Sequence, residues 1–363
     1  MRLRECISAT HYFAQDAIPQ LLDKMNSSSP VVKIDTLQTL TACVTNYGPQ
    51  TIDLYAVSMW DTIRFEILNA NDEDVSNRGL ELLQAITKSL SFGLREAASN
   101  TPLGKFLKVI TDACVKELKD TEGKSAKPAG RILAECASVS YPANRFLIER
   151  TMPVLILLFR ETNSVNKRTA ILEILNGLLD STKSILAEKE AEGNPLLALT
   201  DDLFDVYSKG FLGSTSQEAT YKLTALDGFK KLMAIPGVLA NNEVGIVVQY
   251  FNDIVLRDEN EETWYAPLMS KLTFSRKVLS ALADLAKTKP QLILDITFPA
   301  FLAELPDSES VERRDASLRQ RKGYKAILAA LAQISSERVI FEVLLRRLFS
   351  KLDIVLSSMP HGI

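Results

Sequence analysis

Histidine is almost absent from this chain of 363 residues, which removes the commonest catalytic base. The two histidines, His11 and His361, stand near opposite ends of the sequence. No GxGxxG, GxxxxGK(S/T), HExxH or GxSxG motif occurs, so the loops and nucleophile turns of common enzyme classes are missing. Acidic pairs such as Asp201-Asp202 and Glu261-Glu262 are typical of solvated surfaces. We therefore predict that the chain is not an enzyme and has no catalytic residue and no cofactor.

Cysteine is also scarce, and its spacing does not indicate a metal or disulfide framework. The four cysteines are Cys6, Cys43, Cys114 and Cys136, with no CxxC pair among them. This usage is typical of a reduced compartment. In stacked helices the four thiols could not converge on one metal, although Cys6 with Cys43, or Cys114 with Cys136, could be neighbours. Because Cys43 and Cys114 lie in otherwise apolar segments, we predict buried structural cysteines and no metal site.

Long apolar runs are missing as well. The longest, MPVLILLF at 152–159, is far shorter than the roughly 20 residues that a membrane-spanning helix needs. The first residues, MRLRECISATHYF, lack the apolar core of a signal peptide and look like the middle of an amphipathic helix. Since a repeat array needs polar caps at its ends, we expect a piece of a longer protein that does not enter a membrane.

A basic excess is the last missing feature. The formal net charge is −3, whereas nucleic-acid-binding proteins usually carry a clear positive balance. Direct nucleic-acid binding is therefore not expected. The composition, 46% hydrophobic and 24% charged, is that of a globular chain rather than a disordered one.

Apolar residues recur with the period of an α-helix. In SSSPVVKIDTLQTLTACVTNYGP, residues 27–49, Ser29 fits an N-cap, Pro30 fits the first helical position and Gly48 fits the end. The stripe inside this helix is Ile34, Leu37, Leu40, Val44 and Tyr47, and the upstream stripe is Ile18, Leu21, Leu22 and Met25. No segment alternates with period two for long, so the sequence predicts an all-α fold built from helical hairpins.

The hairpin returns along the chain. IPQLL at 18–22, MPVLI at 152–156 and FPAFL at 298–302 share one pattern of apolar residues around a proline. The residues at matching offsets are Pro19, Pro153 and Pro299, then Val31, Val165 and Val311, then Lys33, Lys167 and Arg313. This order is the signature of HEAT repeats of about 40–47 residues. We predict a HEAT/armadillo-type α-solenoid, one continuous array over 1–363 with roughly eight or nine units.

Each part of the repeat has an expected role. The proline bends the first helix by removing a hydrogen bond, and the valine anchors the second helix under the first. The basic residue lies in the first turn of the second helix, which the helix dipole disfavours, so we expect an acidic or carbonyl partner in a neighbouring unit. A solvated lysine at a helix start is the alternative. Connections are expected at 69–75, 119–127, 188–196, 235–242, 257–267 and 305–311.

Two stretches are candidate partner contacts. The segment 311–325 is basic, and its candidates are Arg313, Arg314, Arg319, Arg321 and Lys322. It could bind an acidic partner or phosphates, or it could be an ordinary solvated helix face. In RDENEETWYAP, 257–267, Trp264 and Tyr265 stand in an acidic loop. They could anchor an interface, or they could fold back onto the solenoid.

Two long stretches resemble a known family. Similarity to the middle of the Mms-nineteen (Met-eighteen) proteins is found in two stretches: DAIPQLLDKMNSSSPVVKIDTLQTLTACVTNYGP (16–49) and WDTIRFEILNANDEDVSNRGLELLQAI (60–86). NNEVGIVVQYFNDIVLRDENEETWYAPL (241–268) and LTFSRKVLSALADLA (272–286) resemble fungal members. The resemblance extends over essentially the whole chain and is most specific in 16–86, although the chain is only about a third of a family member and the family's C-terminal docking region is not evident.

The resemblance implies a HEAT-repeat adaptor of the cytosolic iron–sulfur protein assembly targeting complex. Its expected partners are the assembly subunits and client apo-proteins such as DNA-repair and replication helicases, in the cytoplasm and nucleus, with links to nucleotide-excision repair and transcription. The family has no catalytic residues to carry over. The alternative from the sequence is a nuclear transport receptor-like or other regulatory HEAT scaffold. Direct binding of nucleic acid through 311–325 is a third, less favoured reading.

Overall fold

The computed structural model describes residues 2–69, 71–187, 193–212, 219–258, 268–306 and 314–357, with side chains described except at 2, 187, 257–258, 268–273 and 314–322. These residues form helices and connections without any strand, which confirms the predicted all-α class. The chain divides into two compact units. Unit 1 comprises Met1–Ser214 and Thr220–Val238, and unit 2 comprises Thr215–Ala219 and Leu239–Ile363.

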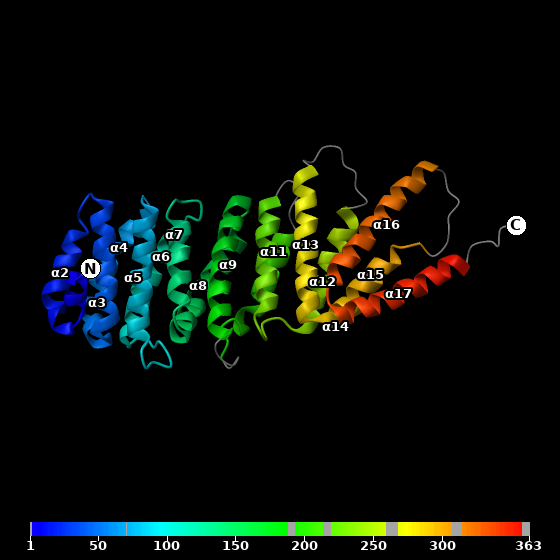
Figure 1. The fold of residues 1–363 in the computed structure, drawn as a ribbon. Coiled ribbons are helices and arrows are strands. Elements are labelled where there is room, and N and C mark those ends of the chain that lie inside the picture. Colours follow the sequence, from blue (N-terminus) through cyan, green and yellow to red (C-terminus); the bar gives the residue numbers. More distant parts are fainter. Residues whose placement is uncertain are drawn as a thin grey trace. The chain divides into compact units, whose positions relative to one another are not determined.

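Unit 1 is an α-solenoid of antiparallel helix pairs (Figure 1). Its helices are α1 (Arg2–Ser8), α2 (Ala14–Lys24), α3 (Pro30–Tyr47), α4 (Pro49–Asn69), α5 (Glu73–Ser91), α6 (Pro102–Leu118), α7 (Ala126–Ala137), α8 (Tyr141–Glu161), α9 (Val165–Ala187), α10 (Thr200–Leu212) and α11 (Ala219–Ala234). Short 3-10 turns at His11–Phe13 (η1) and Leu197–Leu199 (η2) precede α2 and α10.

The helices of unit 1 form two layers. Helices α3, α5, α7 and α9 pack in sequence against one another, and side-chain bonds link α9 to α11. Helices α2, α4, α6, α8 and α10 pack in sequence as the second layer. We call the outer surfaces of these layers the odd-helix face and the even-helix face. Each hairpin thus completes the hydrophobic interior of its neighbours, as expected for a solenoid.

Local sequence signals set the helix ends. Helix α3 starts with Pro30 after the extended Ser29, and it stops at Gly48, whose φ of 83° is a conformation that favours glycine. Asp72 caps α5 by accepting a hydrogen bond from the Val75 amide at 3.0 Å. Thr101 and Ser140 cap α6 and α8 in the same way. The predicted start of α3 at Pro30 and its end at Gly48 are therefore confirmed, although the side chain of Ser29 makes no capping hydrogen bond.

The predicted connections at 69–75, 119–127 and 235–242 fall between consecutive helices, with ends that differ from the prediction by a few residues. Most of 188–196, 257–267 and 305–311 lies outside the described residues. The longest connection among the described residues that was not predicted follows α5. Residues 92–101 separate α5 from α6, and Phe92 at its start is 81% exposed. The sequence does mark this segment: Gly93, whose φ is 75°, follows the end of α5, and Thr101 and Pro102 supply the N-cap and first residue of α6.

The core lies between the two layers and is made of the predicted stripes. Leu37, Leu40 and Val44 of α3 are fully buried, as are Cys43 and, in α6, Cys114. Each such aliphatic side chain contributes about 1.5–3 kcal/mol through removal from water. The largest fully buried side chains of unit 1 are Trp60, Phe106, Phe159, Tyr207, Phe211 and Phe229. Cys43 and Cys114 are therefore buried structural residues, as predicted.

The signature prolines and valines take similar places in their hairpins. Pro19 lies inside α2 and Pro153 lies inside α8, each the first helix of a pair. Val31 and Val165 lie in the first turns of α3 and α9, the second helices. The residues that follow the third proline, Val311 and Arg313, fall outside the described residues.

The predicted anchoring role of the valine is wrong for Val31. Its side chain is 74% exposed, and that of Val32 is 39% exposed. Helix α3 begins at Pro30, so its first turn extends beyond the packed part of the hairpin, and the continuous buried stripe starts only at Thr36 and Leu37. Val165 is half-buried.

The two signature cations that the structure describes have acidic partners in neighbouring hairpins. Lys33 of α3 contacts Glu66 of α4 at 2.5 Å, and both side chains are largely shielded from solvent. Lys167 of α9 lies 4.0 Å from Glu122, in the connection between α6 and α7. The exposed Lys167 pair contributes little to stability, whereas the shielded Lys33 pair fixes two hairpins in register. A solvated lysine is therefore not the correct description of Lys33.

Unit 2 contains α12 (Asn241–Asp258), α13 (Leu268–Thr288), α14 (Pro290–Leu292), the π-helical η3 (Ile293–Thr297), α15 (Phe298–Ala303), α16 (Arg314–Ile334) and α17 (Arg338–Ser357). Helix α13 packs against α12 and α16, and α15 packs against α12, α16 and α17. Pro299 is the second residue of α15, and the π turn directly precedes it. A proline that cannot donate a hydrogen bond accounts for this local widening. One continuous array over 1–363 stays a prediction.

Candidate functional site: surfaces for protein partners

The contacts predicted from the sequence lie almost entirely outside the described residues. Trp264 and Tyr265 fall between α12 and α13, and Arg313 precedes α16. Arg314, Arg319, Arg321 and Lys322 lie within helix α16, but their side chains are not among those described. Their role in partner binding therefore stays a prediction, and the structure directs attention to other surfaces.

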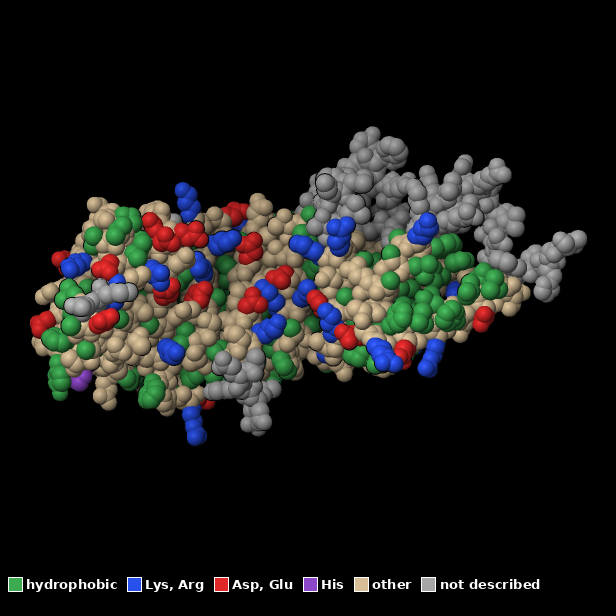
Figure 2. All heavy atoms as spheres, in the orientation of Figure 1, with side chains coloured by type: hydrophobic (Ala, Val, Ile, Leu, Met, Phe, Trp, Pro, Cys, Tyr) green, Lys and Arg blue, Asp and Glu red, His purple; other side chains and the backbone are tan. Residues whose placement is uncertain are grey.

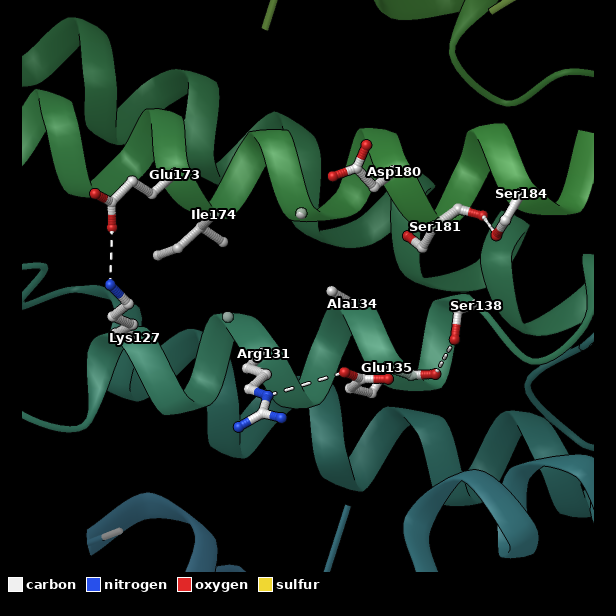
Figure 3. A pocket seen from close by; sticks show the side chains of 12 residues that line it. Lys127, Arg131, Ala134, Glu135, Ser138, Glu173, Ile174, Asp180, Ser181 and Ser184 are labelled. Carbon is white, nitrogen blue, oxygen red and sulfur yellow. Dashed lines mark hydrogen bonds and ion pairs between the residues drawn. The ribbon is translucent and has the colours of Figure 1, made fainter. Parts of the chain in front are cut away.

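A groove on the odd-helix face runs between α7 and α9 (Figure 3). It has a volume of about 450 Å³. Gly130 and Ala134 on α7 face Ile174 and Gly177 on α9, and these four residues form its floor. Because Gly130 has no Cβ, the side chain of Ile174 can lie directly against its backbone; an added methyl group would meet that side chain at 2.7 Å. Small residues on both helices therefore create the groove.

Ion pairs and hydroxyl groups line the rims of this groove. Lys127 on α7 reaches Glu173 on α9 at 3.4 Å and spans it at one end. Arg131 lies 3.9 Å from Glu135 within α7, and Glu135 also accepts a hydrogen bond at 2.6 Å from Gln84 on α5. The charges are thus paired along the face, which leaves an apolar floor between polar rims, an arrangement suited to an extended protein segment.

A second groove continues along α9 toward α11, with a volume of about 440 Å³. Lys231 on α11 is one of its lining residues and lies 2.7 Å from Asp180 on α9 and 2.7 Å from Asp227 on its own helix. Burial by itself lowers the pKa of Lys231, but the hydrogen bonds with Asp180 and Asp227 outweigh it and raise the pKa above its ordinary value. The lysine therefore keeps its charge and links the two helices.

A buried hydrogen-bond chain supports the same grooves from beneath. The Tyr207 hydroxyl donates to the Asn176 side-chain oxygen at 2.7 Å, and the Asn176 amide donates to the Thr224 carbonyl at 2.9 Å. Burial raises the pKa of Tyr207 well above its ordinary value, and the nearby charges of Asp227 and Asp180 raise it further. Tyr207 is therefore a permanent donor that orients Asn176 and ties α9 to α10 and α11.

The cysteines are arranged as packing residues. Burial raises the pKa of the Cys43 thiol, and it raises the pKa of Cys136 to about 12. The pKa of Cys114 is shifted well upward by burial, with a smaller contribution from Cys136 nearby. Cys6 is exposed in α1. Within the described part of the chain, no three His, Cys, Asp or Glu side chains come close enough together to hold a metal ion.

Three of the four thiols should consequently be unreactive in the folded chain. At about pH 8 we expect one thiol, Cys6, to react rapidly with Ellman's reagent, because the thiolate is the nucleophile and burial suppresses it elsewhere. The other three should react only after unfolding in guanidinium. Cys6→Ser should abolish the rapid phase, and rapid reaction of more than one equivalent in the wild-type chain would show that the cysteine burial is misassigned.

Helix α17 of unit 2 carries an apolar surface. Only Ile340 and Leu344 are buried in it, and Figure 2 shows hydrophobic side chains gathered over this helix. Its exposed apolar residues are Val339, Phe341, Phe349, Leu352, Ile354 and Leu356. Phe341, Phe349, Leu352 and Leu356 fall within one arc of the helix. A stripe of this kind is typical of a helix that contacts a further protein surface.

Sequence reasoning missed these surfaces for an identifiable reason. Gly130 and Ala134 are spaced four residues apart on α7, and Gly177 stands on α9, but small residues in a helix have many causes. The small residues on α7 and α9 indicate a groove only when it is known that these two helices face each other. The pairing of α7 with α9 cannot be inferred until the order of the hairpins is known.

Comparison with known proteins identifies relatives for almost the whole chain. A family model described as MMS19_N, Dos2-interacting transcription regulator of RNA-Pol-II, matches residues 1–69. The chain is 26% identical over 345 residues to the Mus musculus "MMS19 nucleotide excision repair protein homolog", a match over 95% of the chain. It is 27% identical over 328 residues to the MMS19 protein of Saccharomyces cerevisiae, named as a DNA repair/transcription protein, a match over 84% of the chain. Over most of its length the chain is therefore similar to MMS19 proteins of animals and fungi.

The similarity extends to relatives from both animals and fungi. The Schizosaccharomyces pombe "DNA repair/transcription protein mms19" is 23% identical over 356 residues, 96% of the chain. Identity to the animal and fungal MMS19 proteins is similar, so a fungal origin stays a prediction. The chain spans about a third of the length of these relatives, 32% for the mouse protein and 33% for the S. pombe protein. Among the described residues, no helix is both long and apolar enough to cross a membrane.

Proposed function

We propose that this chain is a segment of a non-catalytic α-helical scaffold that acts in DNA repair and transcription. The observation that carries the proposal is the similarity, over 95% of the chain, to a protein named for nucleotide excision repair. The yeast relatives are named for both repair and transcription. A solenoid suits this role, because its stacked hairpins offer broad faces on which each partner contacts several repeats.

In its specific form, the proposal is that the scaffold recruits client apo-proteins to the cytosolic iron–sulfur assembly machinery. The clients would include DNA helicases and other repair and replication enzymes, and the protein would work in both cytoplasm and nucleus. Support comes from the family resemblance and from the paired-charge grooves of the odd-helix face, which are shaped for protein segments. The iron–sulfur cluster would be cargo handed to a client, because the thiols of Cys43, Cys114 and Cys136 serve in packing.

Affinity purification tests this function. The full-length parent protein and the 363-residue chain, each carrying the same tag, are captured from the source cells and analysed by mass spectrometry, with the tag alone as the control. We expect the parent to enrich iron–sulfur assembly subunits together with iron–sulfur repair or replication enzymes, and the chain to retain a subset of them. A parent capture that lacks both groups contradicts the proposed function.

A further inference from the structure

The even-helix face of unit 1 carries a row of lysines with no ion-pair partner among the described residues. Lys105, Lys108, Lys116 and Lys119 are all exposed, and Val109 lies among them. At 100° per residue, the four lysines fall within one narrow arc of α6 and its C-terminal cap. No acidic side chain in the described part of the chain comes within ion-pair distance of any of the four. This contrasts with the odd-helix face, where the groove cations are paired.

Apolar side chains lie on the helices to either side of this row. On α4, Leu54, Val57 and Phe65 share one arc and are 75%, 41% and 69% exposed. On α8, Leu157 is 55% exposed. Helix α6 packs against both α4 and α8, so the cations lie between two apolar flanks. We call this region the basic–apolar surface. Its residues are Leu54, Val57, Phe65, Lys105, Lys108, Lys116, Lys119 and Leu157.

The acidic groups on this surface are few. Asp112 lies in the lysine arc of α6, and Asp61 on α4 is 3.6 Å from Arg64. On α8, Glu149 is held by Arg145 at 2.8 Å, and the exposed Glu161 lies one turn beyond Leu157. The surface therefore keeps a net positive charge, and its cations are not neutralised from the neighbouring helices. Like charges held close together and exposed apolar side chains both cost free energy in isolation, and a single partner can relieve both.

The dimensions of the surface define what fits it. From Lys105 to Lys119 the helix rises about 21 Å, and adjacent helices are about 10 Å apart, so the surface measures roughly 20 Å in each direction. An amphipathic helix of about 14 residues, or a shorter extended segment, would cover it. Its partner needs carboxylates to meet the lysines and bulky apolar side chains to cover Phe65, Leu54 and Leu157.

A nucleic acid matches the surface less well. Phosphates would pair with the lysines, but Phe65 is the single aromatic ring of the surface, and the aliphatic side chains of Leu54 and Leu157 provide no stacking platform for further bases. Asp112 and Asp61 would repel a phosphate backbone that followed the row. A protein segment can place uncharged residues opposite these two carboxylates. A nucleic acid cannot, because it carries a phosphate at every nucleotide.

We propose that the basic–apolar surface on α4, α6 and α8 binds an acidic protein segment that carries bulky apolar residues. The inference rests on the proposed function, since it assigns one surface and one class of partner sequence to a protein-binding scaffold. It adds a second binding face, distinct from the grooves on the odd-helix face. Electrostatic attraction gives rapid association, and the apolar flanks supply selectivity for segments that are not merely acidic.

A labelled peptide tests this inference. The probe is an amphipathic peptide of about 14 residues with Leu or Phe at positions i, i+3, i+4 and i+7 and Asp or Glu between them, and binding to the full chain is measured by fluorescence anisotropy at low and physiological ionic strength. Lys108→Glu combined with Lys116→Glu should weaken binding about tenfold or more. Lys88→Glu combined with Lys183→Glu makes the same change in net charge on exposed positions of α5 and α9 and should leave the affinity within about twofold.

The apolar flanks are tested separately. Leu54→Ser combined with Phe65→Ser should weaken binding about fivefold or more, because these side chains are removed from water when the peptide covers them. Circular dichroism melts of all variants establish that they fold. The proposal is overturned if the peptide does not bind, if the apolar variant binds as tightly as wild type, or if single-stranded DNA competes at equal charge concentration. If the lysine variant captures the same partners from cells as the wild type does, that result also counts against this surface. If the wild-type parent captures no partner, that result counts against the proposed function instead.

Discussion

Phe229→Ala is expected to lower the free energy of unfolding of unit 1 by about 3–5 kcal/mol. Phe229 on α11 is fully buried, and its ring centroid lies 5.9 Å from each of three aromatic rings on α10: Phe204, Tyr207 and Phe211. Two of these contacts are edge-to-face, the geometry that adds about 0.5–1.5 kcal/mol beyond burial. Removal of the ring leaves a cavity enclosed by rigid aromatic groups, which cannot easily collapse to fill it.

The measurement is a guanidinium titration followed by far-ultraviolet circular dichroism, with hydrogen exchange of α10 and α11 to locate the effect. Phe65→Ala is the matched control, because Phe65 on α4 is 69% exposed and its removal should change stability by less than about 0.5 kcal/mol. Equal effects of the two substitutions would contradict the assignment of Phe229 to the core. Protection factors should fall in α10 and α11 before they fall in α3.

Gly228→Ala is expected to destabilise unit 1 by about 1–3 kcal/mol, although alanine favours helix more than glycine does. A Cβ at position 228 would lie 1.9 Å from Cε1 of Tyr207 and 2.4 Å from its Cζ. Tyr207 cannot move away freely, because it is fully buried and its hydroxyl is held by Asn176 at 2.7 Å. Overpacking therefore outweighs the gain in helix propensity of about 1 kcal/mol.

Gly323→Ala is the matched control for this prediction. Gly323 lies in helix α16, and a Cβ there would meet no atom within 4 Å. We expect this substitution to raise stability by up to about 1 kcal/mol. A double-mutant cycle locates the cause: in a Tyr207→Ala background, Gly228→Ala should lose most of its cost, because the clash is with that ring. Additive effects would show that the strain arises elsewhere.

The two faces of unit 1 differ in their chemistry. The odd-helix face presents paired charges around its grooves, whereas α6 on the even-helix face presents four lysines that have no ion-pair partner among the described residues and lie between apolar flanks. Two faces with different chemistry allow one scaffold to hold two different proteins at once, which is what an adaptor in the proposed assembly pathway would need. The stripe on α17, which includes Phe349 and Leu352, provides a third surface on unit 2.

The amino-acid sequence alone determined the helical hairpin. Helix α3 starts at Pro30 and stops at Gly48 because a fixed φ and an unhindered positive φ are local properties of those residues. The buried stripe of Leu37, Leu40 and Val44 follows from the 3.6-residue period, which needs no knowledge of the neighbours. The all-α class follows from the same local signals, and the absence of common catalytic motifs is read directly from the sequence.

Only the tertiary structure decided which helices meet and which positions their contacts leave open. Val31 and Leu37 look alike in the sequence, yet the first is exposed and the second fully buried, because burial depends on where the next hairpin stops. The partner of Lys33 is Glu66, and the groove at Gly130 exists because α9 brings Ile174 against it. Such contacts join residues far apart along the chain, and a helical period carries no information about a neighbour at that distance.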